Sequence, residues 1–128
     1  MSARKHIVAV VDDDPRLLES LGELLESAGY VVRTFASAST LLDTTLSEID
    51  CLITDIGMPV IDGFALHDLV KAAHPDLPVF LITGRHENAD RQRAIVKDIS
   101  GFFRKPFDGP TLLTAVADAL HGTKHGRA

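Results

Sequence analysis

The chain has 128 residues, of which 45% are hydrophobic and 24% are charged, and its formal net charge at pH 7 is -5. This length is typical of one domain with a single core, and the apolar content excludes a disordered chain. Because affinity for nucleic acid comes mainly from Lys and Arg neutralising phosphates, the negative charge argues against direct binding of nucleic acid. We therefore expect one domain over residues 1–122 and a polar tail over residues 123–128.

The cysteine content and the length of the apolar stretches bear on the cellular compartment in which the protein is expected. The single cysteine, Cys51, cannot form an intrachain disulfide and lies in an apolar stretch, so we expect a buried thiol and no need for an oxidising environment. No apolar stretch approaches the roughly 18 residues of a membrane helix, and the amino end does not resemble a signal peptide. The sequence predicts a cytoplasmic protein that does not contact a membrane.

The first predicted elements are a buried strand and an amphipathic helix. Ile7–Val11 is a continuous apolar run rich in valine, which is typical of a strand covered on both faces. Asp14 and Pro15 then suit a helix N-cap and a first helical residue, because Asp can accept an orphan backbone N–H and Pro has none to donate. Leucines at spacings of three and four form an apolar stripe, and Gly29 ends the helix.

The middle of the chain alternates between strands and helices in the same way. Strands are expected at Tyr30–Phe35, Cys51–Thr54 and Val79–Thr83, and helices at Ser37–Leu46 and Phe64–Ala73. Ser37 and Ser39 are the candidate caps of the first of these helices. Asp62 and Gly63 predict a turn before the second.

The last third of the chain completes the alternation. We expect a charged helix at Ala89–Val96, a short strand at Gly101–Arg104, a sharp turn at Lys105-Pro106 and a final helix from Pro110 to Leu120. Five strands then alternate with five helices. Since crossovers between parallel strands are right-handed, the sequence predicts an α/β fold, a doubly wound parallel sheet with polar loops along one edge.

Polar or charged residues stand at the ends of four of the five predicted strands. They are Asp12 and Asp13 after the first strand, Asp55 after the third, Thr83 at the end of the fourth and Lys105 after the fifth. Because the carboxyl ends of parallel strands meet at one edge of the sheet, these side chains should lie close together. Carboxylates about 4 Å apart repel by roughly 4 kcal/mol at an effective dielectric near 20, so the cluster needs a cation. Oxygen ligands with one lysine point to magnesium.

Each of these residues taken alone has an ordinary structural explanation. Asp14 is better explained as a helix cap than as a ligand, Lys105 alone could be a solvated surface lysine, and Asp12 or Thr83 alone could be a loop residue. Their joint placement at one predicted edge favours a site. The histidines have no mutual spacing that suggests a site, and we expect all six at the surface: His6, His67, His74, His86, His121 and His125.

Five short motifs occur in a characteristic order and spacing. They are Val-Val-Asp-Asp-Asp-Pro at 10–15, Leu-Ile-Thr-Asp-Ile-Gly-Met-Pro at 52–59, Asp62-Gly63, Leu-Ile-Thr-Gly at 81–84 and Phe-Phe-Arg-Lys-Pro-Phe at 102–107. From His6 to Leu120 the chain resembles the receiver domain of bacterial two-component response regulators, and it is most similar to FixJ-type regulators. The resemblance implies a CheY-like, flavodoxin-like fold with the strand order 2-1-3-4-5.

The resemblance also implies an acceptor residue and a metal site. Asp55 would accept a phosphoryl group from a phosphohistidine on a sensor histidine kinase. Asp12, Asp13 and Asp55 would hold Mg²⁺ together with the backbone carbonyl of Gly57. Because Gly57 has no side chain, the acceptor site would be open at that edge.

Three further residues would respond to phosphorylation. By the resemblance, Lys105 pairs with the Asp55 carboxylate and later with the phosphoryl oxygens, and Thr83 donates a hydrogen bond to the phosphoryl group. Phe102 would be the aromatic residue whose rotamer reports the change, and the Lys105-Pro106 peptide bond would be cis. These expectations describe a phosphoacceptor switch that catalyses its own phosphorylation and dephosphorylation, not a turnover enzyme.

The output of such a switch is less constrained by the sequence. Family resemblance suggests a homodimer through the fourth helix, the fifth strand and the fifth helix, and an effector domain for transcription regulation in the parent protein. One alternative is an aspartate-based phosphohydrolase, although Gly57 stands where such enzymes usually have a second acid. The other is a receiver-like interaction module that works without phosphorylation.

Overall fold

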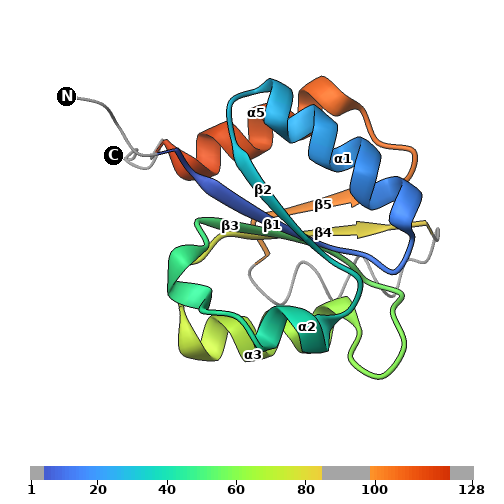
Figure 1. Ribbon diagram of the computed structural model, residues 1–128, viewed down its shortest axis with the longest axis vertical. Helices are drawn as coiled ribbons and strands as arrows, with labels where there is room; N and C mark the ends of the chain where they lie inside the picture. The colour runs from blue at the N-terminus through green and yellow to red at the C-terminus, as the bar shows by residue number, and fades with distance from the viewer. Residues whose placement is uncertain (1–4, 85–98, 122–128) are drawn as a thin grey trace.

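A five-stranded parallel sheet forms the middle layer of the protein (Figure 1). The structure is a computed structural model and describes residues 5–84 and 99–121. The strands are β1 (Ile7–Val11), β2 (Val31–Phe35), β3 (Cys51–Asp55), β4 (Val79–Thr83) and β5 (Gly101–Arg104). Their order is β2-β1-β3-β4-β5, which confirms the predicted order.

The strand register aligns the carboxyl ends of the central strands. The pairs at these ends are Val11 with Thr54, Asp55 with Ile82, and Thr83 with Arg104. The chain therefore leaves β1, β3, β4 and β5 along one edge of the sheet. Asp12, Asp55 and Lys105 are brought to this edge although they are distant in the sequence.

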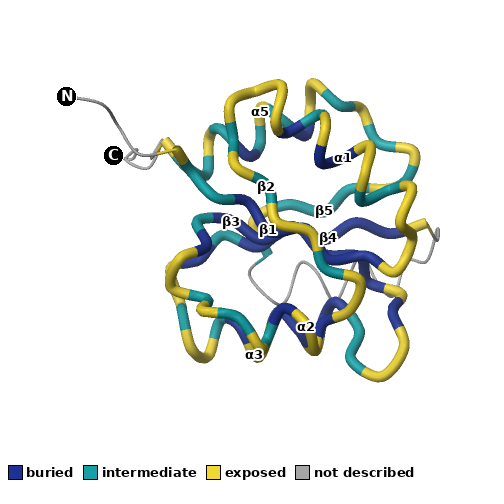
Figure 2. The backbone as a smooth tube through the Cα atoms, in the orientation of Figure 1, coloured by how far each residue is buried: buried dark blue, intermediate teal, exposed yellow. Residues whose placement is uncertain are grey.

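Two layers of helices cover the sheet (Figure 1). Helices α1 (Pro15–Ser27) and α5 (Gly109–Leu120) lie on one face, and α2 (Ala38–Leu42) and α3 (Gly63–Ala73) lie on the other. Consecutive strand residues face opposite layers, so Val8 and Val10 belong to the core cluster of α1 and α5, whereas Ala9 and Val11 belong to that of α2 and α3. Figure 2 shows the buried positions concentrated on β1, β3 and β4.

Aspartate and serine caps fix the starts of the helices, as the sequence predicts for the first two. Asp14 caps α1 by accepting the Arg16 N–H, and Ser37 caps α2 by accepting the Thr40 N–H. Gly29 follows α1 with a φ of 97°, a conformation that glycine adopts without steric cost. Within the described residues, no helix has the length and apolar character that crossing a membrane requires.

The structure corrects three local predictions. The helix expected at Ser37–Leu46 covers only Ala38–Leu42, and a separate 3-10 helix follows at Leu46–Glu48. The reason is local, because the hydroxyl and the N–H of Thr44 both donate to the Leu41 carbonyl and close the turn. Asp62 and Gly63 do not form a separate turn: Asp62 caps α3 and Gly63 is its first residue.

The third correction concerns His67, which is buried with 4% of its surface exposed. It lies three residues after Phe64 and three before Val70, both fully buried, so it belongs to the inward stripe of α3. A spacing argument within α3 would have found this. The helix expected at Ala89–Val96 lies outside the described residues, as do His86 and His125.

Candidate functional site

Three carboxylates meet at the carboxyl edge of the sheet. Asp12 is fully buried, Asp55 is 6% exposed and Asp13 is exposed to solvent. One oxygen of each lies within 4.8 Å of an oxygen of the other two. The cluster predicted from the strand ends is therefore present, and it is open to solvent on the side of Asp13.

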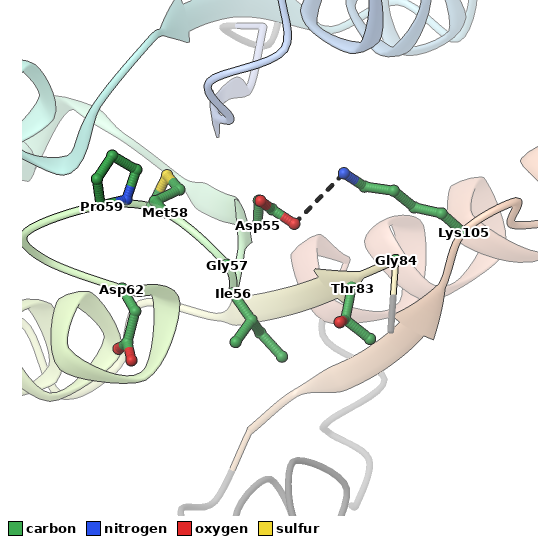
Figure 3. Close-up of a pocket in the computed structure, with 9 residues that line it drawn as sticks. All are labelled: Asp55, Ile56, Gly57, Met58, Pro59, Asp62, Thr83, Gly84 and Lys105. Carbon is green, nitrogen blue, oxygen red and sulfur yellow. Dashed lines mark ion pairs between the residues drawn. The ribbon is translucent and has the colours of Figure 1, made fainter. Parts of the chain in front are cut away.

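The Lys105 ammonium bridges the two buried carboxylates. Its Nζ lies 3.0 Å from Asp12 Oδ2 and 3.3 Å from Asp55 Oδ1, and Figure 3 marks the second of these contacts. The other Asp12 oxygen accepts the Asp14 backbone N–H at 2.8 Å. Both oxygens of Asp12 are thus fixed by the protein, whereas Asp13 adds an exposed oxygen to the cluster.

The electrostatics of the site follow from burial and from like charge. Burial raises the pKa of the Asp55 carboxyl, and the negative charge of Asp12 raises it further, while Lys105 works in the opposite direction. Burial alone would lower the pKa of Lys105, but its hydrogen bond to Asp12 and the charge of Asp55 outweigh this effect and raise it. Lys105 therefore stays charged, and one lysine does not neutralise three acids.

A pocket of about 620 Å³ opens beside Asp55. Its lining residues are Asp55, Ile56, Gly57, Met58, Pro59, Asp62, Thr83, Gly84 and Lys105 (Figure 3). The pocket unites four residues predicted from the sequence, Asp55, Gly57, Thr83 and Lys105. Sequence reasoning missed the other five pocket residues, which are Ile56, Met58, Pro59, Asp62 and Gly84.

The loop between β3 and α3 supplies most of this lining, and its base is tightly fixed. The Gly63 N–H donates to the Ile56 carbonyl at 3.0 Å, and Ile56 and Met58 are buried. A Cβ atom on Gly63 would lie 2.5 Å from the Asp55 carbonyl oxygen. Only glycine allows α3 to begin this close to the acceptor strand, which is why Asp62-Gly63 stands where it does.

Other predicted features have a definite place in the structure. Phe102 on β5 is half-buried and packs against the core cluster shared with α2 and α3, and it is not among the pocket residues. The Lys105-Pro106 peptide bond is cis, as predicted. Cys51 is buried in β3, and burial raises the pKa of its thiol well above the ordinary value.

The donor set fits a hard cation. All three candidate ligands are carboxylate oxygens, and no histidine or cysteine joins the cluster in the part of the chain that the structure describes. Two of the acids are buried beside a single lysine, so a divalent ion would offset their repulsion. An acidic triad of this kind is typical of the Mg²⁺ site of receiver domains.

A parallel β2-β1-β3-β4-β5 sheet with an acidic triad and a bridging lysine at its carboxyl edge defines the class of phosphoacceptor α/β domains. The family model of the response regulator receiver domain matches residues 8–117, and the chain belongs to this family. It is accordingly a phosphoacceptor switch and not a turnover enzyme, which sets aside the phosphohydrolase alternative.

Named relatives agree with this assignment. The chain is 36% identical to the response regulator protein TodT of Pseudomonas putida over 94% of its length and 53% of that protein. It is 31% identical to the transcriptional regulatory protein FixJ of Bradyrhizobium diazoefficiens, over 94% of this chain and 58% of FixJ. The chain thus spans little more than half the length of these two relatives, and the predicted similarity to FixJ is confirmed.

Solved structures show the same fold. A CheY-like response regulator receiver domain protein from Methanospirillum hungatei superposes with a TM-score of 0.87 at 22% identity, over 96% of this chain and 99% of that one. A putative response regulator from Chloroflexus aurantiacus gives a TM-score of 0.84 at 29% identity, over 92% and 99%. These matches confirm the CheY-like architecture.

Proposed function

We propose that the chain takes a phosphoryl group onto Asp55 from the phosphohistidine of a sensor histidine kinase, with Mg²⁺ bound beside it. One Asp55 carboxylate oxygen forms the new bond to phosphorus, the bond from phosphorus to the imidazole nitrogen breaks, and the imidazole keeps the electron pair. The observation that carries this proposal is the placement of Asp55, with Lys105 at 3.3 Å and two further acids within 4.8 Å.

The other site residues then have defined roles. The metal would be held by Asp12, Asp13, Asp55 and the backbone carbonyl of Gly57. Its positive charge would stabilise the negative charge that spreads over the phosphoryl oxygens during transfer. Lys105 keeps its charge because its pKa is raised, and it stays within reach of the acceptor oxygen. Thr83 lines the same pocket as Asp55, which supports the proposal that its hydroxyl donates to the phosphoryl group.

Phosphorylation of Asp55 would then change the conformation of an output surface. Phosphorylation adds nearly two negative charges, which would draw Thr83 toward the phosphoryl group and alter the packing of Phe102 against the core. We propose that this biases a face made of β5, α5 and the helix that the sequence predicts at residues 89–96 toward a homodimer, and that the protein works in the cytoplasm. An effector domain that regulates transcription, outside this chain, is the output that the name of the transcriptional regulatory protein FixJ suggests.

A small phosphodonor tests the core of this proposal. Incubation with acetyl phosphate and Mg²⁺ should add one phosphoryl group, detected by mass spectrometry, and Asp55→Asn should abolish it. Chelation of the metal should prevent the reaction in the unchanged protein. A protein that stays unmodified but still binds a partner would instead be an interaction module that works without phosphorylation. Light scattering before and after the reaction measures the proposed dimer.

A further inference from the structure

A buried hydroxyl precedes the acceptor residue on β3. Thr54 is fully buried, and its register partners are Val11 on β1 and Leu81 on β4. Both partners belong to the core cluster of α2 and α3, so Thr54 lies on an apolar face of the sheet. Burying a hydroxyl there costs free energy unless it forms a hydrogen bond, and valine would fill nearly the same shape without one. Packing alone therefore does not account for a threonine at this position.

The Thr54 hydroxyl donates to the backbone of the acceptor residue. Its Oγ1 lies 3.1 Å from the Asp55 carbonyl oxygen. The pairing of β3 with β1 ends at Thr54, so this carbonyl lies just beyond the last pair of that ladder. Buried backbone carbonyls require a donor, and the hydroxyl supplies one. The bond therefore holds the peptide group that joins Asp55 to Ile56.

Backbone groups hold the same peptide group from its other side. The Ile56 N–H donates to the Ile82 carbonyl at 2.9 Å, and the Ile56 carbonyl accepts the Gly63 N–H at 3.0 Å. Helix α3 begins so close that a Cβ atom on Gly63 would lie 2.5 Å from the Asp55 carbonyl oxygen. Because these contacts come from the backbone, the Thr54 hydroxyl is the contribution that a side-chain substitution can remove.

The orientation of this peptide group bears on the chemistry of the site. The Asp55 carboxylate belongs to the residue whose carbonyl is held, and its Oδ1 lies 3.3 Å from the Lys105 ammonium. A rotation of the Asp55–Ile56 peptide would move the carboxylate relative to that ammonium and to the other two acids. Phosphoryl transfer depends on the in-line approach of the acceptor oxygen, and a displacement of about 1 Å can slow such a reaction about 100-fold.

We propose that Thr54 is a positioning residue for phosphoryl transfer, and that its hydroxyl directs the Asp55 carboxylate toward the incoming phosphorus by holding the Asp55 carbonyl. The inference rests on the proposed function, because it assumes that Asp55 accepts the phosphoryl group. Thr54 is fully buried and is not among the residues that line the pocket, so it acts through the backbone of Asp55 and not on the donor.

Variants that differ in the hydroxyl test this role. Thr54→Val removes the hydroxyl at nearly constant volume. Thr54→Ala and Thr54→Ser both lack the γ-methyl group, and only the second keeps the hydroxyl. At saturating acetyl phosphate and Mg²⁺, the maximal rate of phosphorylation should fall about fivefold or more in Thr54→Val, and Thr54→Ala should be slower than Thr54→Ser by a similar factor. The KM for acetyl phosphate should stay unchanged, because the pocket lining is the same.

Hydrogen exchange gives a second measurement, which requires neither metal nor donor. Thr54→Val should speed exchange of the Ile56 N–H, which belongs to the held peptide group, more than that of the Val10 N–H in β1. A general loss of stability would speed both alike. Thr44→Val is the matched control, because the Thr44 hydroxyl donates to the Leu41 carbonyl at 2.7 Å, between α2 and the 3-10 helix. It should leave the phosphorylation rate unchanged and should not favour exchange at Ile56.

An unchanged maximal rate in Thr54→Val would overturn the inference, and so would equal rates in Thr54→Ala and Thr54→Ser. An equal fall in Thr44→Val would also overturn it, because the effect would then follow stability. If Thr54→Val does not fold, the pair of Thr54→Ala and Thr54→Ser decides. Failure of acetyl phosphate to label Asp55 in the unchanged protein would instead overturn the proposed function itself.

Discussion

The two edges of the sheet use the same kind of side chain in opposite ways. At the amino edge, Asp50 Oδ2 accepts the Ile7 backbone N–H at 2.7 Å and ties β1 to the start of β3. At the carboxyl edge, Asp12 and Asp55 lie beside a third acid, and burial and mutual repulsion raise the pKa of Asp55. One edge uses a carboxylate to hold the fold together, while the other concentrates carboxylates at a cost in stability in order to make a site.

Replacing one lysine at each edge should give the largest difference between the two edges. Lys105→Ala removes the only described ammonium within 4 Å of Asp12 or Asp55, so phosphorylation by acetyl phosphate should fall about 100-fold. Lys71→Ala is the matched control, because the Lys71 ammonium donates to the Leu77 carbonyl at the other edge. It should leave phosphorylation unchanged and lower stability by about 1 kcal/mol. Equal rates in the two variants would show that Lys105 has no part in the chemistry.

The tight start of α3 should be the next most sensitive feature. Gly63→Ala would place a Cβ atom 2.5 Å from the Asp55 carbonyl oxygen, so we expect a loss of roughly 2–3 kcal/mol in the free energy of unfolding. Gly29→Ala has open space around it and should cost only about 1 kcal/mol, for its φ of 97°. Urea denaturation measures both. A smaller loss for Gly63→Ala than for Gly29→Ala would contradict the close packing behind Asp55.

Substitutions of the aspartates themselves should have opposite signs at the two edges. Asp50→Ala leaves the Ile7 N–H without this acceptor and should destabilise the protein by about 1–2 kcal/mol. Asp55→Asn should stabilise the metal-free protein by about 1 kcal/mol, because it relieves repulsion of which Lys105 offsets only a part. Chemical denaturation with a chelator present measures both changes.

The stabilisation expected from Asp55→Asn should depend on pH in a definite direction. Burial raises the pKa of Asp55 in the folded state, so the folded protein binds this proton more tightly than the unfolded chain does. The penalty of the ionised carboxylate is therefore fully present above the raised pKa, and it disappears as pH falls toward the ordinary value of about 4. The advantage of Asp55→Asn should shrink in parallel. An advantage that grows on acidification would contradict the raised pKa.

The smallest expected effect concerns the turn at Val60, in the loop between β3 and α3 at the carboxyl edge, where a positive φ strains a β-branched residue. Val60→Gly should stabilise the protein by about 1 kcal/mol, because the φ of 70° carries no steric penalty for glycine. Val31→Ala at the amino edge has no such strain to relieve and should not stabilise. Thermal unfolding of the two variants gives the comparison, and a destabilised Val60→Gly would mean that the turn is not strained.

Much of the site could be predicted because strand ends are local features that topology then brings together. Apolar runs predicted the positions of β1, β3 and β4. Asp12 and Asp55 follow the runs of β1 and β3, and this was enough to place both at one edge. A short pattern could also identify Asp14 as a cap, because a cap depends only on its immediate neighbours.

The rest depended on information that the residue types do not carry. A valine gives no sign that it will adopt a positive φ, and His67 was assigned by its polarity although its position on α3 decided its burial. The length of α2 depended on where Thr44 directs its hydrogen bonds. The contribution of Asp62 to the pocket required the path of the whole loop.

The bridge from Lys105 to Asp12 joins residues 93 positions apart, near opposite ends of the domain. During synthesis the acids emerge from the ribosome long before the lysine that counters them. A chain that stops short of β5 would carry the acceptor aspartate without its ammonium partner. With the role proposed for Lys105, phosphorylation of Asp55 would require β5 to be in place, and only a chain made almost to the end of the domain would be able to accept a phosphoryl group.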